Sequence, residues 1–248
     1  MDGRAGNWRD NWAFGIITFI WAIITVPVWV MAILLGALVL GPHRSFWLIA
    51  PWFSRQLFAV CGIDWRIEGW EKVPAEIRDR SQPVIFMSNH ESQLDPPFVL
   101  SAIPVPAVFI AKKELKWVPF IGWAAAAAGT IFIDRGDRDR AIRSIKEAAE
   151  KVRRGRSVVI FPEGTRTRTG ELLPFKKGGF NLALEAGVPI IPIATVGGFQ
   201  LLPKGGRRIR PGHYAVRFGE PVDPADFPER DALMAEVRKR MQALLSGL

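Results

Sequence analysis

The sequence predicts an α/β fold, a mixed sheet flanked by helices, preceded by a membrane-embedded pair of N-terminal helices. Three observations lead to this prediction. No Asp, Glu, Lys or Arg occurs between Asp10 and Arg44. Beyond Gly62, short apolar runs alternate with amphipathic stretches, which is typical of α/β domains. The 248 residues are 49% hydrophobic and 23% charged, which excludes a disordered chain and suits one well-buried domain with an appendage.

The N-terminal apolar segment is long enough to enter a membrane. Residues 12–42 would extend about 46 Å as a helix, against roughly 30 Å of bilayer hydrocarbon. A cleaved secretory signal is disfavoured, because the apolar run is too long and the charges before it cancel. Gly41-Pro42 breaks the helix, and a second apolar, aromatic-rich stretch covers residues 45–63.

Two arrangements of these helices are open. A hairpin in one leaflet would leave both ends on the same side of the membrane, whereas a single spanning helix would leave them on opposite sides. The nearby arginines are too evenly spread for the positive-inside rule to decide. We favour the hairpin, with Trp and Arg side chains at the interface, and divide the chain into an anchoring hairpin at 1–63 and a second domain at 64–248.

The second domain contains alternating strands and helices. Strands are predicted at 64–68, 83–87, 107–111, 130–134, 157–161, 189–196 and 214–218. A helix is predicted at 138–154, with Ile142, Ile145, Ala149 and Val152 on its buried stripe. A last amphipathic helix at 232–245 is expected to be capped by Asp231.

Charge and cysteine content exclude several classes. The chain carries 33 Lys and Arg against 24 Asp and Glu, a net charge of +9, of which +8 lies beyond residue 64. Cys61 is the only cysteine, and the three histidines are scattered, so we expect no disulfide, no metal site and no cofactor. A pI near 10.2 would suit a nucleic-acid partner, but no such motif occurs and the apolar segment argues against one.

A histidine and an aspartate follow the second predicted strand. His90 and Asp95 are five positions apart at the carboxyl end of that strand, where α/β sheets build active sites. His90 would take a proton from a hydroxyl, and Asp95 would orient the imidazole. The alternative is a hydrogen-bonded turn with an Asp helix cap. The segment lacks a second zinc-binding histidine, and the chain has neither a Gly-x-Ser-x-Gly elbow nor a Walker loop.

Cationic residues follow other predicted strands. Arg166, in FPEGTR, offers a planar fork of donors suited to phosphate, although an ordinary turn with an exposed arginine is an alternative. Arg135 ends a third cluster, and Lys112 and Lys113 follow another strand. A base with its orienting carboxylate and several cations, downstream of a membrane anchor, would suit a phosphorylated lipid with a free hydroxyl.

Four ordered blocks resemble the glycerolipid acyltransferase family, specifically the 1-acylglycerol-3-phosphate (lysophosphatidate) acyltransferases. The blocks are NHESQLD, GTIFIDR, FPEGTR and VPIIP, and AKKELKWVPFIGW also resembles the family. The resemblance implies a glycerolipid acyltransferase-like fold, with residues 64–248 as the catalytic domain. It further implies that His90 is the catalytic base, with Asp95 as its partner, and that the acyl group passes directly without a covalent acyl-enzyme.

The resemblance also implies the substrates. The acceptor would be lysophosphatidic acid, acylated at the sn-2 hydroxyl, and the donor acyl-CoA or acyl-acyl-carrier protein. Substrate-binding residues would be Lys112, Arg135, Glu163, Gly164, Thr165 and Arg166. Because these donors are cytosolic, the catalytic domain is expected at the inner membrane, facing the cytoplasm.

Other functions remain open from the sequence alone. An enzyme of the same family could acylate lyso-ornithine lipid, glycerol 3-phosphate or another lysophospholipid, and a non-catalytic lipid or carrier-protein binding module is the alternative from another class. A basic cluster is interpreted as either a docking surface or a solvated loop; its members are Lys204, Arg207, Arg208 and Arg210.

Overall fold

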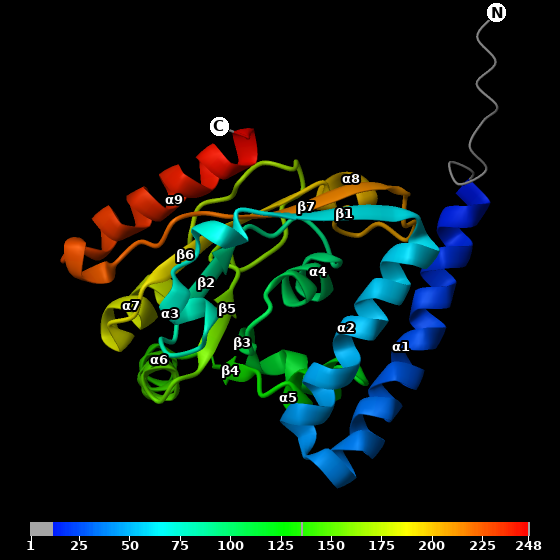
Figure 1. Ribbon diagram of the computed structural model, residues 1–248, viewed down its shortest axis with the longest axis horizontal. Coiled ribbons are helices and arrows are strands. Elements are labelled where there is room, and N and C mark those ends of the chain that lie inside the picture. Colours follow the sequence, from blue (N-terminus) through cyan, green and yellow to red (C-terminus); the bar gives the residue numbers. More distant parts are fainter. Residues whose placement is uncertain (1–11, 135, 248) are drawn as a thin grey trace, which may run out of the picture.

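A seven-stranded mixed sheet lies at the centre of the protein (Figure 1). The computed structural model describes residues 12–134 and 136–247. The strand order is β1-β7-β6-β2-β5-β3-β4, and all neighbours are parallel except β6 and β7. The strands are β1 Ile63–Glu68, β2 Ile85–Ser88, β3 Ala107–Lys112, β4 Ile131–Ile133, β5 Ser157–Ile160, β6 Ile190–Val196 and β7 Gly212–Phe218. The predicted mixed sheet is confirmed, and every predicted strand is present within two residues of its expected ends.

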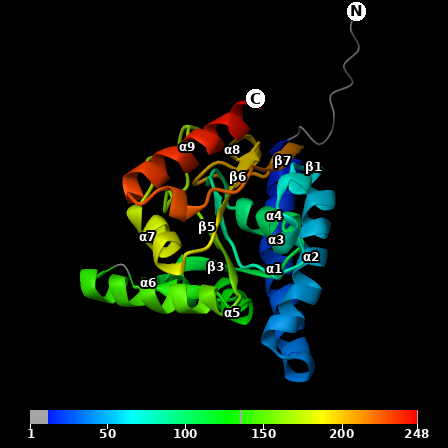
Figure 2. The same cartoon turned by 60° about the vertical axis from the view of Figure 1, so that its left-hand side comes forward.

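Helices cover both faces of the sheet, so there are two apolar cores (Figure 2). The α-helices are α1 Trp12–Leu40, α2 Pro42–Cys61, α3 Ala75–Arg78, α4 Asp95–Ala102, α5 Ile121–Ala127, α6 Arg138–Arg153, α7 Lys177–Ala186, α8 Gly198–Leu201 and α9 Arg230–Ser246. Side chains alternate along each strand. Phe86 packs on one face, with α2 and α4, whereas Ile85 and Met87 pack on the other, with α6, α7 and α9.

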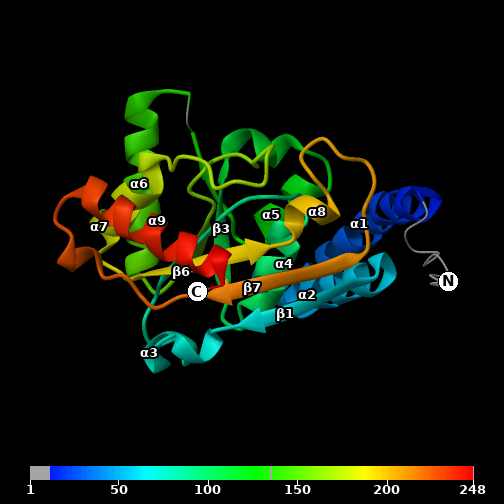
Figure 3. The same cartoon turned by 90° about the horizontal axis from the view of Figure 1, so that it is seen from above.

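Two details of the helix predictions are wrong. In α6 the buried residues include Ala148, Ala149 and Val152, whereas Ile142 is 44% exposed. The first turns of α6 project beyond the sheet (Figure 3), and Ile142 belongs to this N-terminal part of the helix. Asp231 does not cap α9, because the helix already begins at Arg230, and its carboxylate instead accepts a hydrogen bond from that neighbouring side chain.

The two N-terminal helices form the predicted hairpin. Gly41, with a φ of +79°, makes the turn, and Pro42 begins α2. Ser45 Oγ donates to the carbonyl oxygen of Ile33 at 2.6 Å, and a side chain on Gly36 would collide with Ser45, so the helices are closely packed.

The hairpin runs along one flank of the α/β domain (Figure 1). Near the start of α1, the Ile209 N–H donates to the Gly15 carbonyl at 3.2 Å, and near its end α1 packs on α5. The opposite side of α1 is apolar and exposed, from Trp12 to Leu40. Among the described residues, α1 is the one helix long and apolar enough to cross a membrane, so it fits a membrane anchor.

Candidate active site

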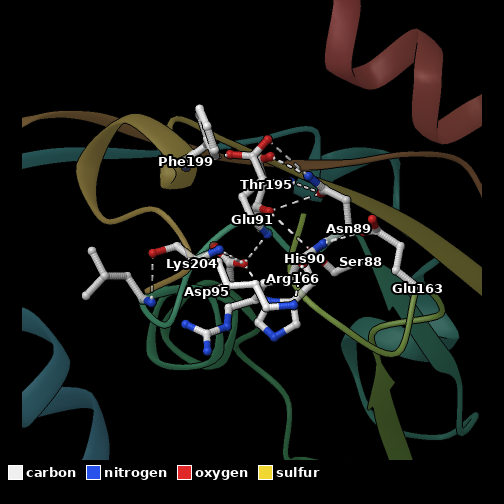
Figure 4. Close-up of polar contacts among 12 residues, drawn as sticks. Ser88, Asn89, His90, Glu91, Asp95, Glu163, Arg166, Thr195, Phe199 and Lys204 are labelled. Atoms are coloured by element: carbon white, nitrogen blue, oxygen red, sulfur yellow. Dashed lines mark hydrogen bonds and ion pairs between the residues drawn. The ribbon is translucent and has the colours of Figure 1, made fainter. Parts of the chain in front are cut away.

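The carboxyl ends of three neighbouring strands bring the site residues together. β2 lies between β5 and β6, and all three run in the same direction. The segments that follow them therefore emerge at one edge of the sheet, which is where open α/β sheets place their ligands. Figure 4 shows the polar network that these segments form around His90.

His90 and Asp95 are directly bonded. His90 Nδ1 lies 2.7 Å from Asp95 Oδ2, and the Asp95 side chain is fully buried. Because the carboxylate accepts a hydrogen, Nδ1 carries the proton and Nε2 is left with a free lone pair. The imidazole is therefore held in the tautomer that a general base requires.

Asp95 is held by three further donors. Its Oδ2 accepts the backbone N–H groups of Glu91 at 2.6 Å and Ser92 at 2.7 Å, while Oδ1 accepts the Tyr214 hydroxyl at 2.8 Å. The alternative to an active site, a hydrogen-bonded turn with an Asp helix cap, is only half present: the side chain of Asp95 bonds the turn before it, but Asp95 is the first residue of α4, Leu94 is the N-cap, and no side-chain capping bond is made. Gly198 makes room for this carboxylate, since a Cβ there would lie 2.7 Å from Oδ1.

Tyr214 is the functional-site residue that the sequence analysis missed most completely. It lies on β7, and its hydroxyl is buried against Asp95. Its ring stacks on Phe98 at 3.8 Å between centroids, and Phe98 stacks on Phe58 of α2 at 3.7 Å. This column of rings connects the hairpin to the carboxylate that orients His90.

The face of the His90 ring is covered by aromatic groups. It stacks on Phe161 with centroids 4.1 Å apart, and Phe161 stacks on Phe109 at 5.9 Å. The His90 side chain is 17% exposed. One face of the imidazole is thus covered by an apolar ring.

The Glu163 side chain points into the site and is hydrogen-bonded to its backbone. Its Oε1 accepts the His90 N–H at 2.6 Å, and its Oε2 accepts the Leu173 N–H at 2.8 Å. Burial raises the pKa of Glu163 to about 7. Both carboxylate oxygens accept backbone hydrogen bonds, through which Glu163 supports the His90 loop, and its predicted part in substrate binding stays a prediction.

A second buried network, also missed from the sequence, joins β2 to β6. The Asn89 side chain donates to the Thr195 carbonyl at 2.8 Å and accepts the Thr195 N–H at 2.6 Å. Glu91 accepts the Phe199 N–H at 3.1 Å, and burial raises the pKa of Glu91 to about 7. These bonds fix the residues on both sides of His90.

The predicted cations are placed at different positions around the site. Burial lowers the pKa of Arg166, and its Nη1 is buried without a hydrogen-bond partner in the described part of the chain. Lys204, from the basic cluster, donates to Thr165 Oγ1 at 2.8 Å and lies 3.4 Å from the Arg166 carbonyl oxygen. Gly164 has a φ of +69°, which favours glycine at that turn.

Two of the other predicted cations, Lys112 and Lys113, lie further along the sheet edge. Lys112 ends β3 in register with Ile133, and its exposed side chain has no hydrogen bond to the His90 network within the described ranges. The neighbouring Lys113 pairs with Asp134 at 2.7 Å. Arg135 lies outside the described residues.

The described residues hold no group of three or more His, Cys, Asp or Glu that could bind a metal ion. They do provide a proton acceptor, Nε2 of His90, and, on the segment that follows the neighbouring strand β5, a buried arginine donor, Nη1 of Arg166, that has no hydrogen-bond partner among them. These features define the class of protein: an α/β domain that carries a carboxylate-bonded histidine at its sheet edge and is joined to an apolar hairpin that fits a membrane anchor.

Comparison with known proteins identifies the family within this class. A family model described as Acyltransferase matches residues 64–196, and the chain belongs to this acyltransferase family. The chain is 38% identical over 198 residues to 1-acyl-sn-glycerol-3-phosphate acyltransferase of Saccharomyces cerevisiae, covering 78% of this chain and 63% of that protein. It is 36% identical to the Pseudomonas aeruginosa protein of the same name, covering 79% of this chain and 72% of that one. The predicted family resemblance is confirmed.

A solved structure has the same fold. The crystal structure of the 1-acyl-sn-glycerophosphate (LPA) acyltransferase of Thermotoga maritima superposes with a TM-score of 0.80 at 25% identity, covering 96% of this chain and 98% of that one. The described sheet and hairpin are therefore those of a known acyltransferase structure, whereas the chain spans somewhat less than two thirds of the yeast relative.

Proposed function

We propose that the protein transfers a fatty acyl group from a thioester to the sn-2 hydroxyl of lysophosphatidic acid, giving phosphatidic acid. The observation that carries this proposal is the bond between His90 Nδ1 and the buried Asp95, which leaves Nε2 free, together with the Nη1 of Arg166, on the segment after the neighbouring strand β5, which has no hydrogen-bond partner among the described residues. The names of the relatives, 1-acyl-sn-glycerol-3-phosphate acyltransferases, support the same acceptor.

The reaction proceeds by direct transfer. His90 Nε2 takes the proton of the acceptor hydroxyl as its oxygen attacks the thioester carbonyl, and Asp95 stabilises the imidazolium that forms. The tetrahedral intermediate then expels the thiolate, which receives the proton from His90. The oxygen–acyl bond forms, the sulfur–acyl bond breaks, and the histidine returns to its neutral form. The thioester is acyl-CoA or acyl-acyl-carrier protein.

The acceptor phosphate lies against Arg166 and Lys204. A buried donor without a partner is costly, and a phosphate oxygen would satisfy the Arg166 Nη1. Lys204, held by Thr165 at the same loop, adds a second positive charge. Gly164 allows the backbone to approach the ligand, and Lys112 is assigned to the outer part of the same site. Arg135, outside the described residues, is proposed as a further substrate-binding residue.

The membrane location follows from the hairpin. We assign residues 1–63 to an anchor in one leaflet of the inner membrane and residues 64–248 to a catalytic domain that faces the cytoplasm, where the thioester donors are found. The contacts of α1 with the domain at Gly15 and at α5 support an in-plane hairpin, because a helix held along the domain in this way cannot also cross the bilayer.

The test is turnover by the purified full chain in lipid vesicles. Labelled acyl-CoA and acyl-acyl-carrier protein are compared as donors, and lysophosphatidic acid is compared with monoacylglycerol, which has the free hydroxyl but no phosphate. The proposal expects phosphatidic acid from at least one donor and a strong preference for the phosphorylated acceptor. Binding of lysophosphatidic acid without any acyl transfer would instead support a lipid-binding module, and equal use of both acceptors would contradict the role of Arg166.

A further inference from the structure

A second exposed apolar surface lies outside the hairpin. Away from α1 and α2, six large apolar side chains are exposed among the described residues, and four of these six lie between positions 117 and 123. They are Trp117 (81% exposed), Val118 (40%), Ile121 (52%) and Trp123 (46%). We call residues 117–123, the junction between the 3₁₀ helix η3 (Lys113–Trp117) and α5, the Trp patch. So dense a cluster of exposed apolar residues marks an interaction site.

The backbone holds these side chains outward. Phe120 has a φ of +61°, a conformation that residues with a side chain rarely adopt, and its ring contacts Trp123 at 5.1 Å between centroids. Gly122 packs against the carbonyl oxygens of Leu115 and Lys116, where a Cβ would come within 2.6 Å of either. The patch is therefore a tightly built turn whose exposed rings and aliphatic groups have a fixed direction.

The Trp patch is continuous with the hairpin. α5 packs on both α1 and α2, and its buried end residues Ala127 and Ala128 share one apolar cluster with Ile33 and Phe46 of the hairpin. Figures 1 and 2 both show α5 beside the end of the hairpin where α1 turns into α2. The exposed apolar side of α1 and the Trp patch thus belong to neighbouring elements.

The composition of the patch suits a bilayer. Two exposed lysines precede it in the chain, Lys112 and Lys116, and Lys113 lies between them in a pair with Asp134. Tryptophan and lysine together are typical of the membrane–water interface, where the indole ring sits at headgroup level and the ammonium group meets anionic lipid. A soluble protein partner would leave the adjoining apolar side of α1 uncovered.

We propose that the Trp patch is a second membrane contact, through which the catalytic domain itself meets the lipid surface beside the hairpin. The inference rests on the proposed membrane anchoring but not on the proposed reaction. It has a consequence for the site. The patch follows the carboxyl end of β3, which is parallel to β5 and so ends at the same edge of the sheet as the His90 loop. The bilayer would thus lie at the edge where a lipid acceptor must enter.

The test uses an environment-sensitive fluorophore on single introduced cysteines. Trp117→Cys and Ile121→Cys are labelled with NBD in the full chain, with Leu35→Cys on α1 as the anchor position and Ile142→Cys on α6 as the matched exposed control. Cys61 is fully buried, so the unmutated chain serves as the labelling blank. Each protein is bound to vesicles of phosphatidylcholine and phosphatidylglycerol in equal parts, with and without nitroxide-labelled lipid.

The expected result is a blue shift and nitroxide quenching at positions 117 and 121, as at 35, and neither change at 142. If NBD at positions 117 and 121 emits as it does in water while NBD at position 35 is quenched, the inference is overturned, although the proposed anchoring by α1 still holds. A blue shift without quenching would also overturn it, because it would assign the patch to a protein interface. If position 35 also shows no quenching, the proposed anchoring, on which the inference rests, is contradicted.

A second measurement does not depend on a label. Trp117→Ser combined with Trp123→Ser should lower retention on the same vesicles, whereas Ile67→Ser, at an exposed apolar position on β1, should not. The circular dichroism spectrum and the melting temperature of the double variant should match those of the parent chain, which shows that it is folded. Retention equal to that of the parent chain would contradict the proposal.

Discussion

Replacing Asp95 by Asn should remove the charge beneath His90 while keeping the hydrogen bond. Oδ2 of Asp95 accepts His90 Nδ1 and the N–H groups of Glu91 and Ser92. An amide NH₂ group cannot accept these bonds, so the carbonyl oxygen of the new side chain must take that position. Its NH₂ group then faces Tyr214, whose hydroxyl oxygen can accept a hydrogen bond as well as donate one. His90 therefore keeps its tautomer.

The fall in kcat of Asp95→Asn then measures the contribution of the negative charge of Asp95 alone. A hydrogen bond to a charged group contributes about 1.5–3 kcal/mol, and two unit charges about 4 Å apart interact by about 4 kcal/mol at an effective dielectric constant near 20. Because about 1.4 kcal/mol is a tenfold change in rate, kcat should fall about 10- to 1000-fold. The thermal midpoint should change little, since the bonds to the backbone are retained.

The assay is the initial rate of lysophosphatidic acid acylation at saturating thioester, with Asp95→Asn, Asp95→Ala and His90→Ala prepared together. Asp95→Asn should retain a rate above that of His90→Ala, and Asp95→Ala should also unfold at a lower temperature, because it leaves buried N–H groups unpaired. The reasoning would be refuted if a folded Asp95→Asn protein were as inactive as His90→Ala, or as active as the parent chain.

Three further predictions follow from the same geometry. Tyr214→Phe removes one buried donor to the aspartate, so it should reduce kcat less than Asp95→Asn does and leave the acceptor KM unchanged; a larger effect on KM would contradict this placement. Arg166→Ala and Lys204→Met should each raise KM for lysophosphatidic acid more than KM for the thioester, with little change for monoacylglycerol, and an equal rise for both substrates would argue against a phosphate site. Burial raises the pKa of Glu91 and of Glu163 from 4.5 to about 7. Each group then binds protons more strongly in the folded protein, so its contribution to stability is present below pH 4.5 and is lost as the pH rises through 7. Melting temperatures should fall across this interval, and they should fall less in Glu91→Gln, which leaves Glu163 to titrate there; a steady rise would contradict the assignment.

The parts of the fold that depend on local pattern were predictable from the sequence. Each strand is a short apolar run, and the hairpin follows from a long uncharged segment broken at Gly41-Pro42. The bond between His90 and Asp95 could also be predicted from the sequence, because the two residues are close together in the chain at the end of one strand. Ile142 was misplaced because helical periodicity identifies a stripe but not where the sheet beneath it ends.

The rest of the site depends on which strands are neighbours. Tyr214 is 119 positions from Asp95 in the chain, and Asn89 is 106 positions from Thr195. These pairs meet only because β6 lies next to β2 and β7 pairs with β6 in the antiparallel direction. Lys204 reaches Thr165 from a loop 39 positions away. No local motif encodes such contacts, although Tyr214, as the chain's single tyrosine on an apolar strand, was a residue worth singling out.

The central claim is that His90 is the general base of acyl transfer to lysophosphatidic acid. The most direct measurement is kcat for this reaction by His90→Ala, with circular dichroism and the melting temperature showing that the protein is folded. Because general-base catalysis contributes about 10²- to 10⁴-fold, kcat should fall by that factor while the acceptor still binds. Turnover close to that of the parent chain in the folded variant would contradict the account.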